Sequence, residues 1–218
     1  MDLHADLHQR AVLDTTALPW APSPMAGVER RMLDRRGGEV ARATSIVRYA
    51  PGSRFERHVH AGGEEILVLE GTFSDEQGDY AAGTYLRNPA DSSHAPFSTG
   101  GCALLVKLQQ MHPGDQQRLV IDTNNAAWRP GLVNGLEVMP LHGFGSEHVA
   151  LVRWAPGTRF QPHGHPGGEE IFGRLSHPPV VVSRGRGDPA GGAAACSWMG
   201  RKPPANRRPA TEPASACC

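Results

Sequence analysis

The strongest constraint on the fold of this chain is an internal duplication. Residues 45–55, SIVRYAPGSRF, match residues 150–160, ALVRWAPGTRF, at an offset of 105, and the pentapeptide GGEEI that begins at Gly62 recurs at the same offset. Trp20 and Trp128 precede similar segments at an offset of 108, so a three-residue gap separates the two matches. Self-similarity at a fixed period is typical of a repeated structural unit. We therefore predict one plan built twice, with each copy beginning near its tryptophan.

Short apolar runs separated by turn residues predict that the chain is all-β. Runs rich in Ile, Val, Leu, Tyr and Phe alternate with Gly, Pro, Asn and Asp breaks, of which Asp75–Asp79 and Asn88–Ser92 are the clearest turns. No segment of helical length shows a 3.6-residue period. Such strands favour an antiparallel barrel or jelly roll, which can hold an ion or a small ligand among its inward-facing residues. The predicted strands of the first copy are residues 27–33, 42–50, 65–70, 83–87 and 102–109.

Two alternate histidines followed by a glutamate occur in each copy and predict a metal site. In a strand, side chains two residues apart share a face, so His58 and His60 point together. The flexible turn at 61–63 lets Glu64 return toward the same centre as a third ligand, and Glu65 then faces the opposite side of its strand. The equivalent residues of the second copy are His163, His165 and Glu169.

The sequence around this motif resembles the cupin superfamily. Its first motif is matched by Gly52, His58, His60, Glu64 and Gly71, and its second motif by Gly83, Pro89 and His94. Two positions depart from the pattern, since Asp91 stands at a usual glycine and Ser98 at a frequent asparagine. More narrowly, the run from His58 to Glu76 looks like the cupin domain of ChrR-type anti-sigma factors and their stand-alone relatives. The resemblance spans about residues 14–173, is specific over 45–111, and implies the ligand set His58, His60, Glu64 and His94.

The second copy matches the first only in part. The offset of 105 places Met199, not a histidine, opposite His94, and Pro, Gly, Ala and Arg make up 27 of the last 46 residues. This composition is poor in the alternating strands that a barrel requires. We hypothesise that a change of reading frame, or an equivalent replacement, has overwritten the chain after Phe172; the alternative is a degenerate second barrel. The predicted organisation is a double-stranded β-helix (jelly-roll, cupin) barrel at 14–111, an incomplete second copy at 119–173, and a low-complexity, disordered tail at 174–218.

Charge and cysteine usage exclude several classes of protein. The formal net charge is zero, and the first 172 residues carry 15 basic and 20 acidic side chains, which disfavours nucleic-acid binding by the folded part. The start of the chain is unlike a signal peptide, and no run reaches membrane-spanning length. The cysteines, at 102, 196, 217 and 218, form no disulfide framework. We expect a cytoplasmic protein without a membrane or nucleic-acid partner, and an unclosed second barrel whose free strand edges favour a homo-oligomer.

The predicted function is that of a metal-binding cupin with a small-molecule ligand or substrate in its barrel. Three imidazoles and one carboxylate suit zinc, iron, manganese or nickel alike. The resemblance favours a ChrR-like regulatory or sensing cupin, here without the helical zinc domain that binds sigma factor. A metal-dependent dioxygenase acting on a small diketone or hydroxyketone is the alternative, a purely structural metal is a third reading, and whether the chain is an enzyme stays open. Candidates for the cavity wall, or equally for ordinary barrel core, are Tyr85, Arg87 and Phe97.

Overall fold

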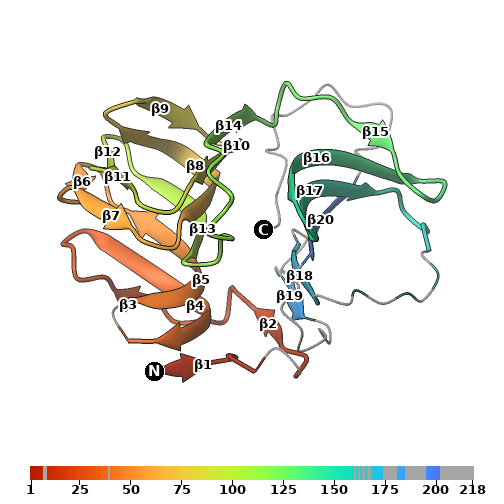
Figure 1. Cartoon of the computed structure of the whole chain (residues 1–218), viewed down its shortest axis with the longest axis horizontal. Helices are drawn as coiled ribbons and strands as arrows, with labels where there is room; N and C mark the ends of the chain where they lie inside the picture. Colours follow the sequence, from red (N-terminus) through yellow and green to blue (C-terminus); the bar gives the residue numbers. More distant parts are fainter. Residues whose placement is uncertain are drawn as a thin grey trace. The chain divides into compact units, whose positions relative to one another are not determined.

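The protein is seen here in a computed structural model, which divides into two compact units (Figure 1). Unit 1 comprises residues 1–5 and 17–122, and unit 2 comprises residues 6–16 and 123–218. The structure describes residues 1–6, 9–38, 40–159, 161, 163, 165, 168–173, 181–184 and 195–201.

In the described residues of unit 1 every regular element is a strand, as the sequence predicts. An eleven-stranded sheet has the central order β1-β4-β5-β13-β8-β10-β14, its pairings are antiparallel, and β7 and β11 form a separate two-stranded sheet. The strands are β1 (Asp2–Leu3), β3 (Ala21–Pro22), β4 (Val28–Gly37), β5 (Ala41–Tyr49), β6 (Ser53–Arg54), β7 (His58–His60), β8 (Glu64–Asp75), β9 (Gly78–Ala81), β10 (Thr84–Asn88), β11 (Ser92–His94), β12 (Phe97–Ser98), β13 (Cys102–Leu108) and β14 (Leu119–Asp122).

The five predicted strands of the first copy correspond to β4, β5, β8, β10 and β13. β8 is longer than predicted because it does not end at Gly71. That glycine adopts a positive φ of 70°, and the register between β8 and β13 shifts nearby, between Ala103 and Leu104. The strand therefore bends through an irregularity and continues to Asp75, since glycine tolerates this backbone conformation.

Alternate side chains of these strands fill the interior of unit 1. On β8 and β10, the inward residues Ile66 and Leu86 are opposite each other, as the antiparallel register requires. Burying such large apolar side chains is the main source of stability for a barrel of this kind. The buried cluster consists of Val28, Tyr49, Ile66, Val68, Phe73, Tyr80, Leu86, Cys102, Leu104 and Val106.

A buried ionic network occupies the opposite face of β8 and β10. Arg87, which is fully buried, forms ion pairs with Glu65 and with Asp115, the latter at 2.7 Å. The hydroxyl of Tyr85 donates a hydrogen bond of 3.0 Å to Glu65. Glu65 does face away from Glu64, as predicted. The network also fixes the segment after β13 to the barrel, since Asp115 belongs to that segment.

Unit 2 repeats the plan of unit 1 in its first half and departs from it in the second. Its sheet has the order β15-β16-β17-β20-β18-β19-β2. β13 of unit 1 runs antiparallel to its neighbours β5 and β8, whereas β20 runs parallel to both β17 and β18. The strands are β2 (Val12–Asp14), β15 (Arg129–Pro130), β16 (Leu136–Phe144), β17 (Glu147–Trp154), β18 (Glu169–Phe172), β19 (Val181–Arg184) and β20 (Ala195–Arg201).

The strand that precedes each repeat's tryptophan joins the sheet of the other repeat. β14, ahead of Trp128, pairs with β10 in unit 1, and β2, ahead of Trp20, pairs with β19 in unit 2. Both strands have similar sequences, VLD and LVID. Each unit is therefore discontinuous in sequence, with a boundary at Asp122 rather than at the edge of a repeat.

The predicted tail at 174–218 falls mostly outside the described residues, and within it the structure describes β19 and β20. The described part of the chain contains no helix that is long and apolar enough to cross a membrane.

Candidate metal centre

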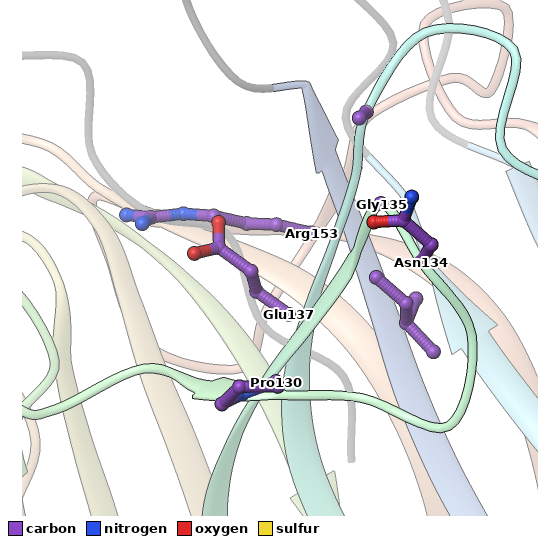
Figure 2. Close-up of a pocket in the computed structure, with 7 residues that line it drawn as sticks. Pro130, Asn134, Gly135, Glu137 and Arg153 are labelled. Atoms are coloured by element: carbon purple, nitrogen blue, oxygen red, sulfur yellow. The ribbon is translucent and has the colours of Figure 1, made fainter.

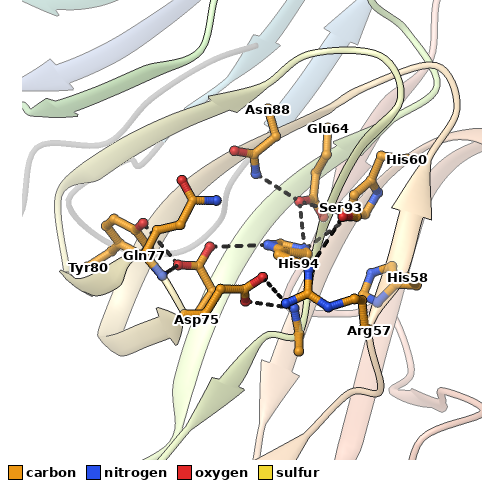
Figure 3. Close-up of polar contacts among 12 residues, drawn as sticks. Arg57, His58, His60, Glu64, Asp75, Gln77, Tyr80, Asn88, Ser93 and His94 are labelled. Atoms are coloured by element: carbon orange, nitrogen blue, oxygen red, sulfur yellow. Dashed lines mark hydrogen bonds and ion pairs between the residues drawn. The ribbon is translucent and has the colours of Figure 1, made fainter.

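The pairing of β7 with β11 brings three histidines together in unit 1 (Figure 3). His94 lies directly opposite His58 in the antiparallel register, and His60 lies two residues along the same strand face. One ligand atom from each of the three lies within 4.8 Å of the others. His60 and His94 are buried, and His58 is half-buried. The three histidines form a cluster that could hold a metal ion.

Glu64 reaches the same centre from the start of β8. Its Oε2 atom lies 3.5 Å from His60 Nε2 and 3.4 Å from His94 Nε2, and Asn88 donates a 3.3 Å hydrogen bond to it. The turn before it depends on Gly63, whose φ is 78° and whose position leaves no room for a Cβ atom beside Met111. The structure thus brings together the four residues that the cupin resemblance implies as ligands. We call them the unit 1 centre: His58, His60, Glu64 and His94.

Hydrogen bonds behind two of the rings set which nitrogen faces the centre. Nδ1 of His58 lies 2.8 Å from the carbonyl oxygen of Glu56, and Nδ1 of His94 lies 3.3 Å from Oδ2 of Asp75. Both partners can only accept, so both Nδ1 atoms donate. Nε2 of each ring is thereby directed toward the centre, where Nε2 of His60 and Nε2 of His94 are 3.0 Å apart.

These separations fit a single bound cation. Nitrogen and oxygen ligands at about 2.0–2.2 Å from one ion lie roughly 3–3.5 Å from each other. The His60–His94 distance of 3.0 Å and the Glu64 distances of 3.4 and 3.5 Å are in this range. Converging nitrogen lone pairs and a buried carboxylate repel one another unless a cation or a shared proton lies between them. The residues present therefore fit a divalent metal, with imidazole and carboxylate ligands suited to first-row ions.

Phenylalanine rings pack against two of the three histidines. Phe55 packs against His58 with ring centroids 5.6 Å apart, and Phe73 packs against His94 at 6.0 Å. Burial lowers the pKa of both His58 and His60 below the ordinary value for histidine, although the Glu56 carbonyl and the Glu64 carboxylate oppose the shift. Both imidazoles are then neutral near pH 7, which is the form that binds metal.

His94 behaves differently because two carboxylates face it. Burial lowers its pKa, but the hydrogen bond to Asp75 and the charge of Glu64 outweigh that effect and raise the pKa overall. The same two carboxylates that favour a proton on this ring also favour a metal cation beside it.

Sequence reasoning did not identify several residues of the site. The sequence predicts only turns at Asp75 and at Asn88. The place of Asp75, two residues after the inward Phe73, signals that the two side chains share a strand face. Asp91, at the usual glycine of the second motif, has a φ of 64°, a conformation that glycine adopts freely and that aspartate tolerates better than most residues.

Two of the three suggested cavity-wall residues lie elsewhere. Tyr85 and Arg87 belong to the buried ionic network with Glu65, on the face of β10 opposite Leu86 and the barrel interior. Successive side chains of a strand point to opposite faces, so Tyr85 and Arg87 face away from the interior because Leu86 faces into it. Phe97 is partly buried and pairs with Ser74 and Arg54 through the backbone of β12.

The three candidate ligands of the second copy keep the local geometry of the first. The rings of His163 and His165 are 4.7 Å apart, as are those of His58 and His60. Nε2 of His165 lies 3.6 Å from Glu169, but their side chains are 33% and 23% exposed, whereas those of His60 and Glu64 are 7% and 9% exposed. We call these three residues the unit 2 set. Met199 falls in β20, whose side chains lie outside the described ones.

Unit 2 also contains a pocket of about 260 Å³, lined in part by Glu137, Arg153 and Asn134 (Figure 2). The guanidinium of Arg153 stacks on Trp128, with 3.7 Å between its carbon and the ring centroid. Burial lowers the pKa of Arg153, and Glu137 opposes that shift. Unit 1 repeats this stacking at Trp20, where Arg48 lies 4.3 Å from the ring centroid and pairs with Glu29 at 2.5 Å. The recurrence indicates a structural element of the repeat rather than a second chemical site.

The comparison with protein families finds a match to the family described as ChrR Cupin-like domain, over residues 8–112 and 116–207. A search of curated proteins found no match.

Among solved structures, the chain is similar to a candidate dioxygenase from Nostoc punctiforme, with 15% identity and a TM-score of 0.51. That match covers 62% of this chain and 56% of the Nostoc chain, so this chain spans little more than half of it. A structure of Rhodobacter sphaeroides SigE in complex with the anti-sigma ChrR matches at 28% identity, covering 42% and 50%, with a TM-score of 0.36. An acetylacetone dioxygenase from Acinetobacter johnsonii matches at 18% identity, covering 48% and 80%, with a TM-score of 0.37.

Proposed function

Because the chain belongs to the family of ChrR cupin-like domains, we propose that the unit 1 centre binds one divalent metal ion and that unit 1 acts as a regulatory or sensing domain. The observation that carries the proposal is the convergence of three imidazoles, two of them buried, and one buried carboxylate on a common centre. A bound ion would supply a Lewis-acidic position at which a small ligand could be recognised.

The unit 1 centre is accessible from the side of His58, which supports an exchangeable coordination position for a ligand on that side. His58 is only half-buried and its neighbour Val59 is 61% exposed, whereas His60 and His94 are buried. A small ligand could therefore approach past His58, while Phe73 packs against the buried His94. The ring of Phe55 would form an apolar wall beside that approach.

The first experiment is elemental analysis of protein purified without a nickel column. Purified protein should carry close to one divalent ion per chain, and His94→Ala should lose it. A protein that neither retains nor rebinds zinc, iron, manganese or nickel would overturn the proposal.

A second experiment separates sensing from catalysis with one probe, acetylacetone. We expect the probe to shift the unfolding temperature of iron-loaded protein, because binding to the native state alone stabilises it, with no oxygen uptake above the buffer rate. His94→Ala, assayed in the same way, is the matched control. Oxygen consumed in proportion to acetylacetone would replace the sensing role with a dioxygenase acting on diketones.

A further inference from the structure

The ligand His94 is held from behind by a chain of polar side chains (Figure 3). Oδ2 of Asp75 lies 3.3 Å from His94 Nδ1, and Oδ1 of Asp75 accepts hydrogen bonds from the backbone of Gln77 at 2.8 Å and from the hydroxyl of Tyr80 at 3.1 Å. Arg118 in turn donates a 3.2 Å hydrogen bond to that hydroxyl. The side chain of Asp75 is 1% exposed, so this carboxylate sees the imidazole and these donors rather than bulk water.

The position of Asp75 decides both the orientation and the tautomer of the ring. An ionised carboxylate only accepts hydrogen bonds, so Nδ1 of His94 carries the proton and Nε2 faces His60 and Glu64. The ring also packs on Phe73, which limits its tilt. A carboxylate behind an imidazole ligand increases the basicity of the metal-facing nitrogen.

We propose that Asp75 is a positioning residue for His94, and that Tyr80 and Arg118 hold its carboxylate in place; the proposal rests on metal binding by the unit 1 centre. The described contacts of the other ligands differ from this one. Nδ1 of His58 and Nδ1 of His163 each meet a backbone carbonyl oxygen instead.

The test is Asp75→Asn, with Asp79→Asn as the matched control on the same hairpin. Asp79 accepts a 2.6 Å hydrogen bond from Ser74, a contact that does not involve the metal ligands. In Asp75→Asn the amide can donate to Nδ1, which shifts the ring proton to Nε2, the metal-facing atom. We expect zinc affinity to fall by about 10- to 100-fold and the visible spectrum of the cobalt-loaded protein to change. Asp79→Asn should match the parent in both measurements.

Tyr80→Phe serves as a second variant because it keeps the carboxylate and removes one of its donors. It should weaken zinc binding, but less than Asp75→Asn does. If the asparagine variant does not fold, zinc affinity of Tyr80→Phe equal to that of the parent overturns the positioning role. Zinc affinity and cobalt spectra of Asp75→Asn equal to those of Asp79→Asn would overturn the positioning role while leaving metal binding intact. A parent protein that binds no zinc would instead overturn the proposed function itself.

Discussion

Units 1 and 2 begin with the same ligand motif but differ in what surrounds it. In both, two histidine rings lie 4.7 Å apart and a glutamate four residues later turns back toward them. In unit 1, β11 adds His94, β8 adds Asp75, and β13 runs antiparallel between its neighbours. In unit 2, the corresponding place between β17 and β18 is taken by a parallel strand. A local motif thus sets the ring geometry, but a metal centre also needs the later strands that bury and complete it.

The largest expected effect concerns the buried network of unit 1. The backbone register places Arg87 opposite Glu65 in unit 1, and in unit 2 it places Arg184 opposite Glu170 in the same way. Arg87→Ala leaves Glu65 and Asp115 as buried, uncompensated charges, and breaking such a pair costs about 3–5 kcal/mol. Urea unfolding should show a loss of that size. Arg57→Ala, which removes an exposed ion pair to Glu76, is the control and should change the midpoint little. A similar, small change in both variants would contradict the stabilising role of this network in unit 1.

The second-largest expected effect is on zinc binding, compared between the unit 1 centre and the unit 2 set. His94→Ala removes a buried ligand of the unit 1 centre, so we expect zinc affinity at the tight site to fall by at least 10-fold and the zinc-induced rise in unfolding temperature to shrink. His163→Ala removes an exposed ligand of the unit 2 set and should leave both quantities nearly unchanged. Isothermal titration and thermal unfolding of the two variants provide the measurements. Equal losses of zinc affinity in the two variants would show that the two ligand sets contribute equally to zinc binding.

The smallest effect is a pH dependence confined to unit 1. The hydrogen bond from the backbone of Ala95, together with Arg57 at 2.6 Å, lowers the pKa of Glu76 in the folded state. A lowered folded-state pKa gives stability that is present above the ordinary glutamate range and is lost as the pH falls through the folded-state value. Glu76→Gln should therefore reduce stability slightly at neutral pH and make the acid side of the profile less steep. Val181→Thr in unit 2 changes no titratable group and should leave the pH profile unchanged. If Glu76→Gln and the parent lose stability identically at acid pH, Glu76 does not contribute to the pH dependence of stability.

The sequence predicted the parts of the fold that depend on local pattern. The alternation of apolar residues gave β4, β5, β8, β10 and β13, and the parity argument placed Glu65 opposite Glu64. The cupin resemblance supplied His94, which is 34 residues from His60 and could not be joined to it by spacing alone. Regular strand alternation is a short-range signal, and it holds wherever one face is buried.

Other features depend on long-range pairing and could not be read from the sequence. The joining of β14 to β10 and of β2 to β19 depends on which sheet edges meet, since each strand is short and its sequence fits either sheet. The role of Asp75 was hidden by the turn that follows it, because turn residues and buried carboxylates share the same amino acids. The sequence analysis leaves Tyr85 and Arg87 open between the cavity wall and ordinary barrel core, because it does not use the parity that places Leu86 inward.

The measurement that tests the central claim most directly is the stoichiometry of tight zinc binding to metal-free protein. Titration against a competing chelator counts the ions and ranks their affinities. If the unit 1 centre is the working site, one ion binds tightly and any second ion binds at least 10-fold more weakly, because the unit 2 set is more exposed and its ligands pay a larger ordering cost. Two ions of equal affinity would contradict the claim that the strands completing unit 1 create the metal centre.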